Sequence, residues 1–552
     1  MLIKKFFASR LLLKTALVCF IAAYSSSSEA QIVWQTPGSE VYKFLSRQAQ
    51  KGNINFEDLV QPVSRKAIAK HLATLQDSVT NLSTVEKAEL QFYLKEFSEF
   101  NIQHPDTLLF LKKDQAERSR FLTVNKGEFL LRGDPLSTIA YAGGNGTSVL
   151  TLGNGITFWG HASKNLTFQG SFQDITETGT GIDGLRDFTP KEGIVRTISL
   201  SSNSVNYSRL KGNITYAWNN GSVSIGKDQL LLGYGENGRI ILSDKAPAYP
   251  QIRIDYKPLK WLQFQYSHLW LHSGIIDSAR NYSKGNGVYS NDREFYIPKF
   301  MATHSLNIYP LNGLALTLGE SMVYSDRLNI AYLIPIMFFK AYDQYESKYN
   351  VPTGSNGQFF FQASSRNHIP KTHLYSTLFI DEIRASTIFN RQKSRNQLGF
   401  NIGVLVTDVV VPYLTLGSEY TRINPFAYEN LIPAQTYSSQ GYSLGDWMGN
   451  NADRFIVFAK YTPLPRLKTE LQLQKIRKGG PGRVLDQYFA EPQPPFLFDL
   501  QRDFNESQFK VSYELINSLQ LQALFTRTNG RMVSSGTNIN RSRFDFSISF
   551  GL

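Results

Sequence analysis

The stretch that decides the fold is RSRFDFSISFGL, residues 541–552. Its apolar side chains, Phe544, Phe546, Ile548, Phe550 and Leu552, alternate with Arg543, Asp545, Ser547, Ser549 and Gly551. Because successive side chains of a strand point to opposite sides, this segment has one apolar face and one polar face. A soluble sandwich can show the same period but rarely lines it with aromatics. We therefore expect the closing strand of a transmembrane β-barrel, apolar toward lipid and polar toward the lumen.

The same two-residue period recurs from about Leu136 onward, for example over residues 165–173, 397–406, 467–474 and 508–515. Outer-membrane barrels use an even number of strands of about ten residues each. We predict an all-β transmembrane fold over residues 126–552, an antiparallel barrel of about eighteen strands. The strand pattern is least clear between Gly193 and Gly226.

Short turns and long connections separate the expected strands. Turn signals stand at Asn219-Asn220-Gly221, Leu311-Asn312-Gly313 and Ile516-Asn517-Ser518. Long segments cover Ile175–Glu192, Leu230–Pro250, Ser273–Lys299, Ser325–Thr372, Ile423–Ala452 and Arg477–Asn505. Since barrels keep short turns inside and long loops outside, we expect these six at the cell surface, where recognition would reside.

Residues 1–30 have the pattern of a secretory signal peptide: basic residues, an apolar run from Leu11 to Tyr24, and small residues before Gln31. The run is too short and interrupted for a membrane anchor, and Val18 before Cys19 disfavours lipidation. Cys19 is the only cysteine of the chain, so disulfides and Cys-ligated zinc are excluded after cleavage. No later stretch approaches the roughly 18 apolar residues of a spanning helix.

The composition agrees with a barrel, because aromatics make up 13% of the chain while the hydrophobic share is only 42%. The net charge is +13, or +10 without the first 30 residues, which carry four basic side chains and one acidic one. These basic residues are scattered rather than clustered. Lipid headgroups of the outer membrane or an acidic surface polysaccharide are therefore the expected partners, and nucleic acid is not.

Residues 31–125 show helical spacing instead, which predicts a small periplasmic helical module before the barrel. A first helix carries Val41, Phe44 and Leu45, a second starts at Ser64, and a third starts with the capping box Ser83-Thr84-Val85-Glu86. The module could dock on the periplasmic mouth of the barrel or bind a periplasmic protein partner.

Several motifs resemble the capsule-assembly Wzi family in its Bacteroidetes-like form. They are Gly233–Arg239 with Ala246–Pro250, Gly319-Glu320-Ser321 leading to Tyr332–Pro335, Phe379–Glu382, Ser418–Arg422 with Asn424–Tyr428, Ser443–Asp446 with Gly449–Asp453, and Pro62–Arg65. The resemblance implies an outer-membrane barrel with a periplasmic helical bundle that acts as a lectin for capsular polysaccharide. Asp381-Glu382 stands where we expect two aspartates in the family. No sugar-contacting residue is matched, so the lectin role carries over as a class and not as a site.

Candidate glycan-binding residues lie in the expected loops: Arg239, Tyr342, Tyr345, Lys348 and Arg366. Aromatic faces suit sugar rings, and Lys or Arg suits uronic-acid carboxylates. The alternative for any single aromatic residue is that it belongs to the interfacial aromatic girdle or packs the loop on itself.

Strand parity places seven charged residues in the lumen: Glu419, Lys468, Glu470, Lys510, Glu514, Arg543 and Asp545. Opposite charges on neighbouring strands can pair and fill the lumen, which we favour, or they can line a channel. Glu320 falls on the lipid-facing parity. It must lie beyond the hydrocarbon or be turned inward by a bulge at Gly319, because a carboxylate against lipid is costly.

The sequence contains no metal-binding, nucleophile-elbow or phosphate-loop motif, and His268 and His272 are too far apart on a strand to share a metal. We expect no cofactor and no enzymatic activity. The hypothesis from the sequence is a non-enzymatic outer-membrane protein that binds or organises surface polysaccharide. The alternatives are a porin-like channel for polar solutes and a scaffold for a surface assembly, secretion or motility complex.

Overall fold

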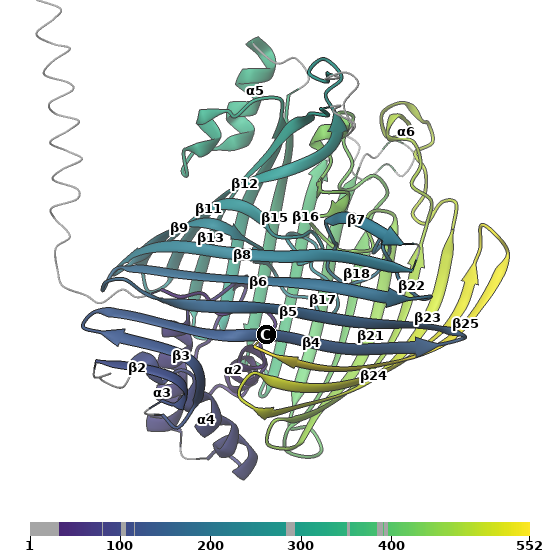
Figure 1. Cartoon of the computed structure of the whole chain (residues 1–552). Helices are drawn as coiled ribbons and strands as arrows, with labels where there is room; N and C mark the ends of the chain where they lie inside the picture. The colour runs from purple at the N-terminus through teal and green to yellow at the C-terminus, as the bar shows by residue number, and fades with distance from the viewer. Residues whose placement is uncertain are drawn as a thin grey trace, which may run out of the picture.

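The computed structural model describes residues 32–551 except 80, 101–105, 115, 202, 283–292, 350–353, 383–389, 391–392 and 394–395. The expected signal peptide lies outside these residues. Within them, eighteen strands form a closed ring in which every neighbouring pair is antiparallel. The predicted barrel is therefore confirmed, and Figure 1 shows the ring from the side.

The ring runs through β4 (Phe129–Gly144), β5 (Thr147–His161), β6 (Leu166–Gly179), β8 (Ser204–Trp218), β9 (Gly221–Asp228), β11 (Tyr249–Leu259), β12 (Leu262–Ile276), β13 (Tyr296–Leu311), β14 (Leu314–Ser325), β15 (Asn356–Arg366), β16 (Thr372–Glu382), β17 (Gln397–Thr407), β18 (Leu414–Ile423), β21 (Ala452–Leu464), β22 (Leu467–Lys478), β23 (Arg502–Ile516), β24 (Leu519–Met532) and β25 (Thr537–Phe550). β25 closes it by pairing with β4 from Phe544 opposite Gly143 to Phe550 opposite Ser137. The last strand of the chain is thus the closing strand that its alternation predicts.

The outer surface of the ring is apolar. Exposed side chains include Ile139, Tyr141, Ile156, Ile214, Ile225, Leu318, Ile402, Leu473, Phe544 and Phe546. They occupy alternate positions of their strands, and polar residues between them face the lumen. In the described part of the chain, no helix has the length and apolar character needed to cross a membrane.

Three short strands extend the sheet without belonging to the ring. β3 (Ser119–Lys126) pairs with the first residues of β4, and β2 (Thr107–Lys113) pairs with β3. β7 (Arg196–Ser201) pairs with the start of β8, in the region where the sequence pattern is least clear. Small ladders also join β1 (Val60–Gln61) to β10 (Leu231–Leu232) and β19 (Ser438–Ser439) to β20 (Tyr442–Ser443).

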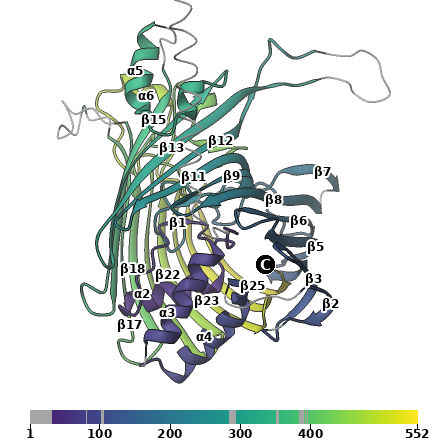
Figure 2. The ribbon, with the colours of Figure 1, turned by 90° about the vertical axis from the view of Figure 1, so that its left-hand side faces the viewer.

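Three helices lie at one end of the ring: α2 (Glu40–Gln50), α3 (Arg65–Ser78) and α4 (Thr84–Glu96), followed by the short η1 (Ser98–Phe100). They share a core that includes Phe44, Leu45, Ile68, Leu72 and Leu90, and the predicted capping box at the start of α4 is present. We call these three helices the helical module. Figure 2 shows the helical module at the end of the barrel where the predicted short turns lie, which we take as the periplasmic end.

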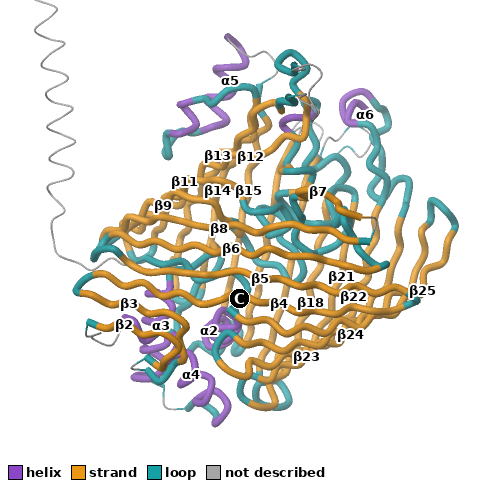
Figure 3. Tube along the Cα trace, in the orientation of Figure 1, coloured by secondary structure: helices purple, strands orange, loops and turns teal. Residues whose placement is uncertain are grey.

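Two of the six predicted surface loops fold into the barrel instead. Residues 229–248 and 424–451, which we call the inner loops, are largely buried (Figure 3). Their apolar residues, among them Ile240, Ile241, Leu242, Tyr437 and Leu444, pack against the wall residues Met301, Val323, Phe360 and Phe379. Burial of this apolar surface explains why these loops turn inward.

The predicted loop Ser325–Thr372 is also wrong in part, because it contains the strand β15. Its remaining residues include η2 (Ile330–Leu333) and α5 (Phe339–Tyr349), which lie at the extracellular end (Figure 1). The long connection between Glu382 and Gln397 is not among the six that the sequence predicts. The connection between β22 and β23 carries α6 (Val484–Phe489).

Glu320 is not turned inward, because the register of β14 shows no bulge at Gly319. It stays on the outward parity of β14 and is 3% exposed, because residues 326–349 cover it from outside. Its carboxylate accepts hydrogen bonds from the backbone N–H of Phe339 (3.0 Å) and of Lys340 (2.5 Å) at the start of α5. A carboxylate at a helix N-terminus pairs with free N–H groups there, so Glu320 holds α5 against the wall.

Candidate functional site

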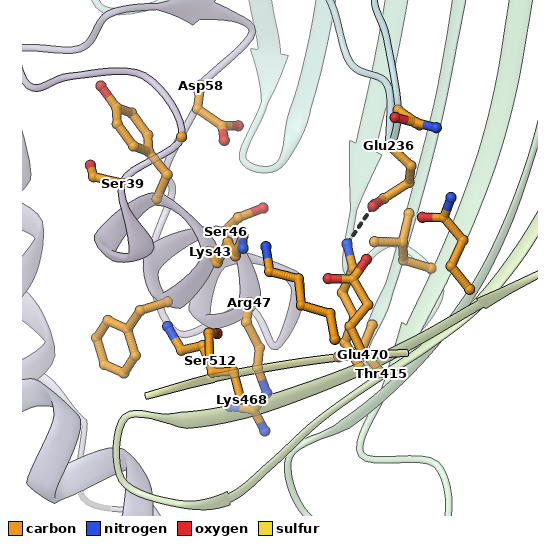
Figure 4. A pocket seen from close by; sticks show the side chains of 18 of the residues that line it. Ser39, Lys43, Ser46, Arg47, Asp58, Glu236, Thr415, Lys468, Glu470 and Ser512 are labelled. Carbon is orange, nitrogen blue, oxygen red and sulfur yellow. Dashed lines mark hydrogen bonds and ion pairs between the residues drawn. The ribbon is translucent and has the colours of Figure 1, made fainter. Parts of the chain in front are cut away.

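A cavity of about 540 Å³ lies between the helical module, the inner loop 229–248 and the wall formed by β21–β24. Three of the predicted lumen charges, Lys468, Glu470 and Lys510, line it. Figure 4 shows Lys468 and Glu470 on the wall facing Lys43 and Arg47 of α2. Their contacts depend on what fills the lumen, which here is the helical module and the inner loop.

Most charges in this cavity have partners of opposite sign. Lys468 Nζ lies 2.6 Å from Glu40 of α2, and Lys460 pairs with Glu236 of the inner loop (Figure 4). Glu470 stands opposite Lys460 on β21 and Lys510 on β23 in the strand register. The cavity thus mixes both signs.

The charge of Glu40 illustrates how strongly the cavity favours ion pairs. Burial alone would raise the pKa of its carboxyl, but Lys43, at 2.9 Å, and Lys468 outweigh burial and hold that pKa well below its usual value. Glu40 is therefore ionised at neutral pH. It joins the helical module to the barrel wall.

Glu419 connects the wall to the inner loops. Its carboxylate accepts hydrogen bonds from the Tyr375 hydroxyl (2.6 Å) and from the Glu236 backbone N–H (3.0 Å). Arg454 Nη2 lies 3.5 Å from Glu419 and 3.1 Å from Asp446 in the second inner loop. Glu419, Tyr375, Arg454 and Asp446 are buried, so their arrangement depends on the inner loops staying in place.

The other predicted lumen charges lie on β23 and β25 and do not line this cavity. Glu514 accepts a hydrogen bond from the Ser518 backbone N–H at the periplasmic turn (3.2 Å). Arg543 and Asp545 pair along β25 at 3.0 Å and are partly exposed. The seven predicted charges therefore spread along the lumen and do not form one cluster.

The five predicted glycan-binding residues lie in three different places. Tyr342, Tyr345 and Lys348 are on α5 at the extracellular end. Arg239 is in the inner loop, where it lines the cavity and its Nε donates to the Gly233 carbonyl at 2.8 Å. Arg366 is the last residue of β15, at the periplasmic end.

Arg366 is thus not a loop residue, and it binds the helical module. Its guanidinium forms an ion pair with Asp58 at 2.7 Å and donates to Ser46 (3.1 Å) and to the Phe56 carbonyl. It is 2% exposed. The sequence pattern does not reveal this role, because it predicts a loop where β15 lies.

On α5, two aromatic rings face solvent. The ring centroids of Tyr345 and Tyr349 are 5.0 Å apart, and Lys348 Nζ lies 5.3 Å from the Tyr349 ring. Both tyrosines are exposed, whereas the Tyr342 hydroxyl bonds Asn329 at 3.1 Å and packs α5 onto η2. The exposed pair has the character of a sugar-stacking surface.

Sequence reasoning missed the groups that hold the loops inside. Lys245 of the inner loop donates to the carbonyls of Arg186 (2.5 Å), Thr189 (2.9 Å) and Lys191 (3.0 Å). Burial lowers the pKa of Lys245 to about 8. No local signal marks such a lysine, because its partners are backbone carbonyls of another loop. Among the described residues, no three acidic, His or Cys side chains gather in a way that could hold a metal ion.

Comparison with known proteins identifies the fold. No protein-family model and no curated protein matches the sequence. Among solved structures, the chain is similar to Wzi, an outer-membrane protein involved in group 1 capsule assembly in Escherichia coli and described as a carbohydrate-binding β-barrel. The TM-score is 0.57 at 12% identity, and the match covers 95% of this chain and 100% of Wzi.

The fold is that of Wzi. Weaker likenesses link the chain to OccAB2 of Acinetobacter baumannii (TM-score 0.43, 12% identity, 76% of this chain and 98% of that one) and to OprD of Pseudomonas aeruginosa (0.42, 8%, 76% and 94%). With its closed ring and apolar outer surface, the protein is an outer-membrane β-barrel.

Proposed function

We propose that this protein is a Wzi-like, non-enzymatic lectin that binds and organises surface polysaccharide at the extracellular end of the barrel. The observation that carries the proposal is the likeness to Wzi over 95% of the chain. A match of this extent takes in the helical module as well as the barrel.

The arrangement of the lumen supports binding rather than free diffusion. The inner loops and α2 enter the ring from opposite ends and are tied to its wall by buried ion pairs. Polar groups that remain open to a large polymer therefore lie at the extracellular end, on α5 and around α6. The basic net charge, +10 without residues 1–30, favours an acidic polysaccharide.

A glycan array probed with the detergent-purified protein tests the proposal. The array should carry neutral and acidic capsular polymers, and we expect saturable binding to at least one acidic polymer. A silent array, with protein that still shows the heat-modifiable mobility of a folded barrel, would count against the lectin role.

A second candidate function is passage of small polar solutes, and one feature favours it. The lumen-facing side chains of β23 and β24 near the cavity, such as Gln508, Lys510 and Gln522, are only partly buried. Water can therefore reach this side of the lumen. Planar-bilayer recordings separate the two functions, because a porin gives large steady currents, whereas a lectin with a filled lumen gives small ones.

A further inference from the structure

Residues 326–349 leave β14 at its extracellular end and fold back over the outer face of β12–β14. Figure 1 draws α5, which belongs to this segment, outside the ring of strands. Tyr332 and Phe339 of the segment pack into one cluster with Phe300 and Met322, which point outward from the wall. We call residues 326–349 the outer cover.

A row of three wall residues marks the level at which the outer cover meets the barrel. Tyr266 of β12 stands opposite His304 of β13, which stands opposite Glu320 of β14. Glu320 follows Leu314, the first residue of β14, by six positions, and Leu318 just before it is 49% exposed on the lipid side. At a strand tilt of about 40°, each residue rises about 2.5 Å along the membrane normal, so the row lies about 15 Å above the start of β14. The apolar band of such barrels is about 25 Å tall, so this row lies inside it.

Each residue of the row bonds the backbone of the outer cover. The Tyr266 hydroxyl donates to the Tyr332 carbonyl at 2.8 Å. His304 Nδ1 lies 3.0 Å from the Pro335 carbonyl, which only accepts, so this nitrogen is the donor. Glu320 accepts from two N–H groups at the start of α5. Ionisable side chains are costly at this depth, and here they satisfy backbone groups that water cannot reach.

Other backbone groups of the outer cover pair within it. The N–H groups of Tyr332, Ile334 and Met337 donate to carbonyls three residues earlier, each at 3.1 Å. The Ala331 N–H donates to the Asn329 side chain at 3.1 Å. Non-helical backbone is tolerated at membrane depth when its polar groups are satisfied by protein in this way.

The exposed side chains of the outer cover near this level are apolar. Between residues 328 and 338, every exposed residue is apolar, and they are Leu328, Ile330, Ile334, Ile336 and Phe338. Ile336 is 84% exposed and follows Pro335, whose carbonyl is fixed to the wall by His304. A contiguous exposed apolar patch of this kind marks a surface that is covered by another apolar phase or by a partner.

We propose that the outer cover lies within the outer leaflet of the outer membrane, with Ile330, Ile334 and Ile336 in contact with lipid acyl chains. Continuity identifies lipid as the occupant, because the outer cover interrupts the lipid-facing band of β14 directly above Leu318 and replaces it with an apolar surface of its own. The polar row is thereby shielded from lipid, and α5 is fixed to the barrel close to the membrane surface. This inference goes beyond the proposed function and does not depend on it.

Fluorescence quenching in phosphatidylcholine vesicles tests the inference on the full chain. Ile330→Cys and Ile336→Cys, each labelled with bimane, report on the outer cover. Leu473→Cys on the outer face of β22 is the lipid control, and Ser534→Cys in the exposed turn between β24 and β25 is the water control. The wild type, whose one cysteine is Cys19, gives the background labelling. Heat-modifiable mobility checks that each labelled barrel is folded.

We expect a lipid with a nitroxide on its acyl chain to quench the Ile330 and Ile336 labels within twofold of the Leu473 label. The same lipid should quench them at least threefold more than the Ser534 label. Iodide, which stays in water, should quench the four labels in the opposite order.

Two results would overturn the inference. Iodide quenching of the Ile330 and Ile336 labels as strong as that of the Ser534 label would mean that the outer cover lies in water. Labels that neither quencher reaches would mean that protein covers this surface, either a partner or a second copy of the chain.

Discussion

Arg366, the last residue of β15, forms a buried ion pair with Asp58 of the segment between α2 and α3, at 2.7 Å. This contact ties the helical module to the barrel wall. Breaking a buried pair by removing one partner costs about 3–5 kcal/mol, because the other charge stays buried and unpaired. The attachment of the helical module should therefore depend on this single arginine more than on exposed charges.

We predict that Arg366→Met loosens the helical module and leaves the ring intact. Limited proteolysis should cleave residues 36–100 at least tenfold faster than in the wild type, while the heat-modifiable mobility of the barrel is retained. Arg483→Met, which removes an exposed ion pair with Asp486, is the control and should change neither measurement. Equal proteolysis of the two variants would contradict the role of Arg366.

The helical module should also lose stability in acid, because of Glu86. Burial alone would raise the pKa of its carboxyl, but Lys51 at 2.6 Å, the Ser83 N–H and Arg47 at 2.5 Å hold that pKa down to about 2. The folded pKa lies below the unfolded value of 4.5. Between these two pH values the unfolded state binds more protons, so stability present at neutral pH is lost as the pH falls from 4.5 to 2.

Hydrogen exchange of the α2 and α4 amides, followed by mass spectrometry across this range, checks the prediction. Protection in the wild type should fall steeply below pH 4.5 after correction for the intrinsic exchange rate. Glu86→Gln should show less protection at pH 7 and a flatter dependence on pH. A wild-type profile that stays flat to pH 2 would rule out Glu86 as a source of acid sensitivity.

Glu320 should be required for the order of α5 but not for the barrel. Glu320→Gln keeps the shape and removes the charge that accepts the N–H groups of Phe339 and Lys340. A charge at a helix N-terminus contributes about 1 kcal/mol or more when partly buried. In hydrogen exchange, the amides of residues 330–349 should therefore exchange about tenfold faster in the variant, and those of β14 should be unchanged. Faster exchange along β14 as well would mean that Glu320 supports the barrel wall itself.

What the sequence predicts well here is local. The alternation of β25 and the capping box of α4 depend on neighbours within a few residues, and both are found in the structure. The alternation of β22 also predicts that Lys468 and Glu470 face the lumen, and both line the cavity beside α2. These features follow from rules that act along one strand or one helix.

The errors arise where distant segments meet. β15 was missed because Phe359, Phe360 and Phe361 break the alternation, and the structure explains why: Phe360 is fully buried against the inner loops, while Phe361 is exposed on the outer face. Where apolar residues fill the lumen, an inward-facing residue such as Phe360 is apolar too, and the alternation of apolar and polar residues is lost. Glu320 breaks the alternation on the outer face of the barrel. A charged residue stands there at an apolar position because α5 covers that part of the wall. Neither contact can be inferred from the strand that makes it.

The packing of the inner loops gives a last prediction, at Gly238. Its φ is +144°, and a Cβ there would lie 2.4 Å from Asp446 Oδ2, the atom that pairs with Arg454 at 3.1 Å. Gly238→Ala should push Asp446 away and open the contact between the two inner loops. Gly146→Ala is a matched control, because Gly146 also has a positive φ, +77°, but a Cβ there meets nothing within 4 Å.

Labelling of an Ile241→Cys reporter measures the effect, since Ile241 is fully buried in the inner loop. A membrane-impermeant maleimide should label the reporter at least tenfold faster with Gly238→Ala than with Gly146→Ala, and planar-bilayer conductance should rise only with the former. Both substitutions strain a backbone of positive φ, and only Gly238→Ala also brings a Cβ against Asp446. Equal labelling would mean that the inner loops are held by their apolar core and not by the pair of Asp446 and Arg454.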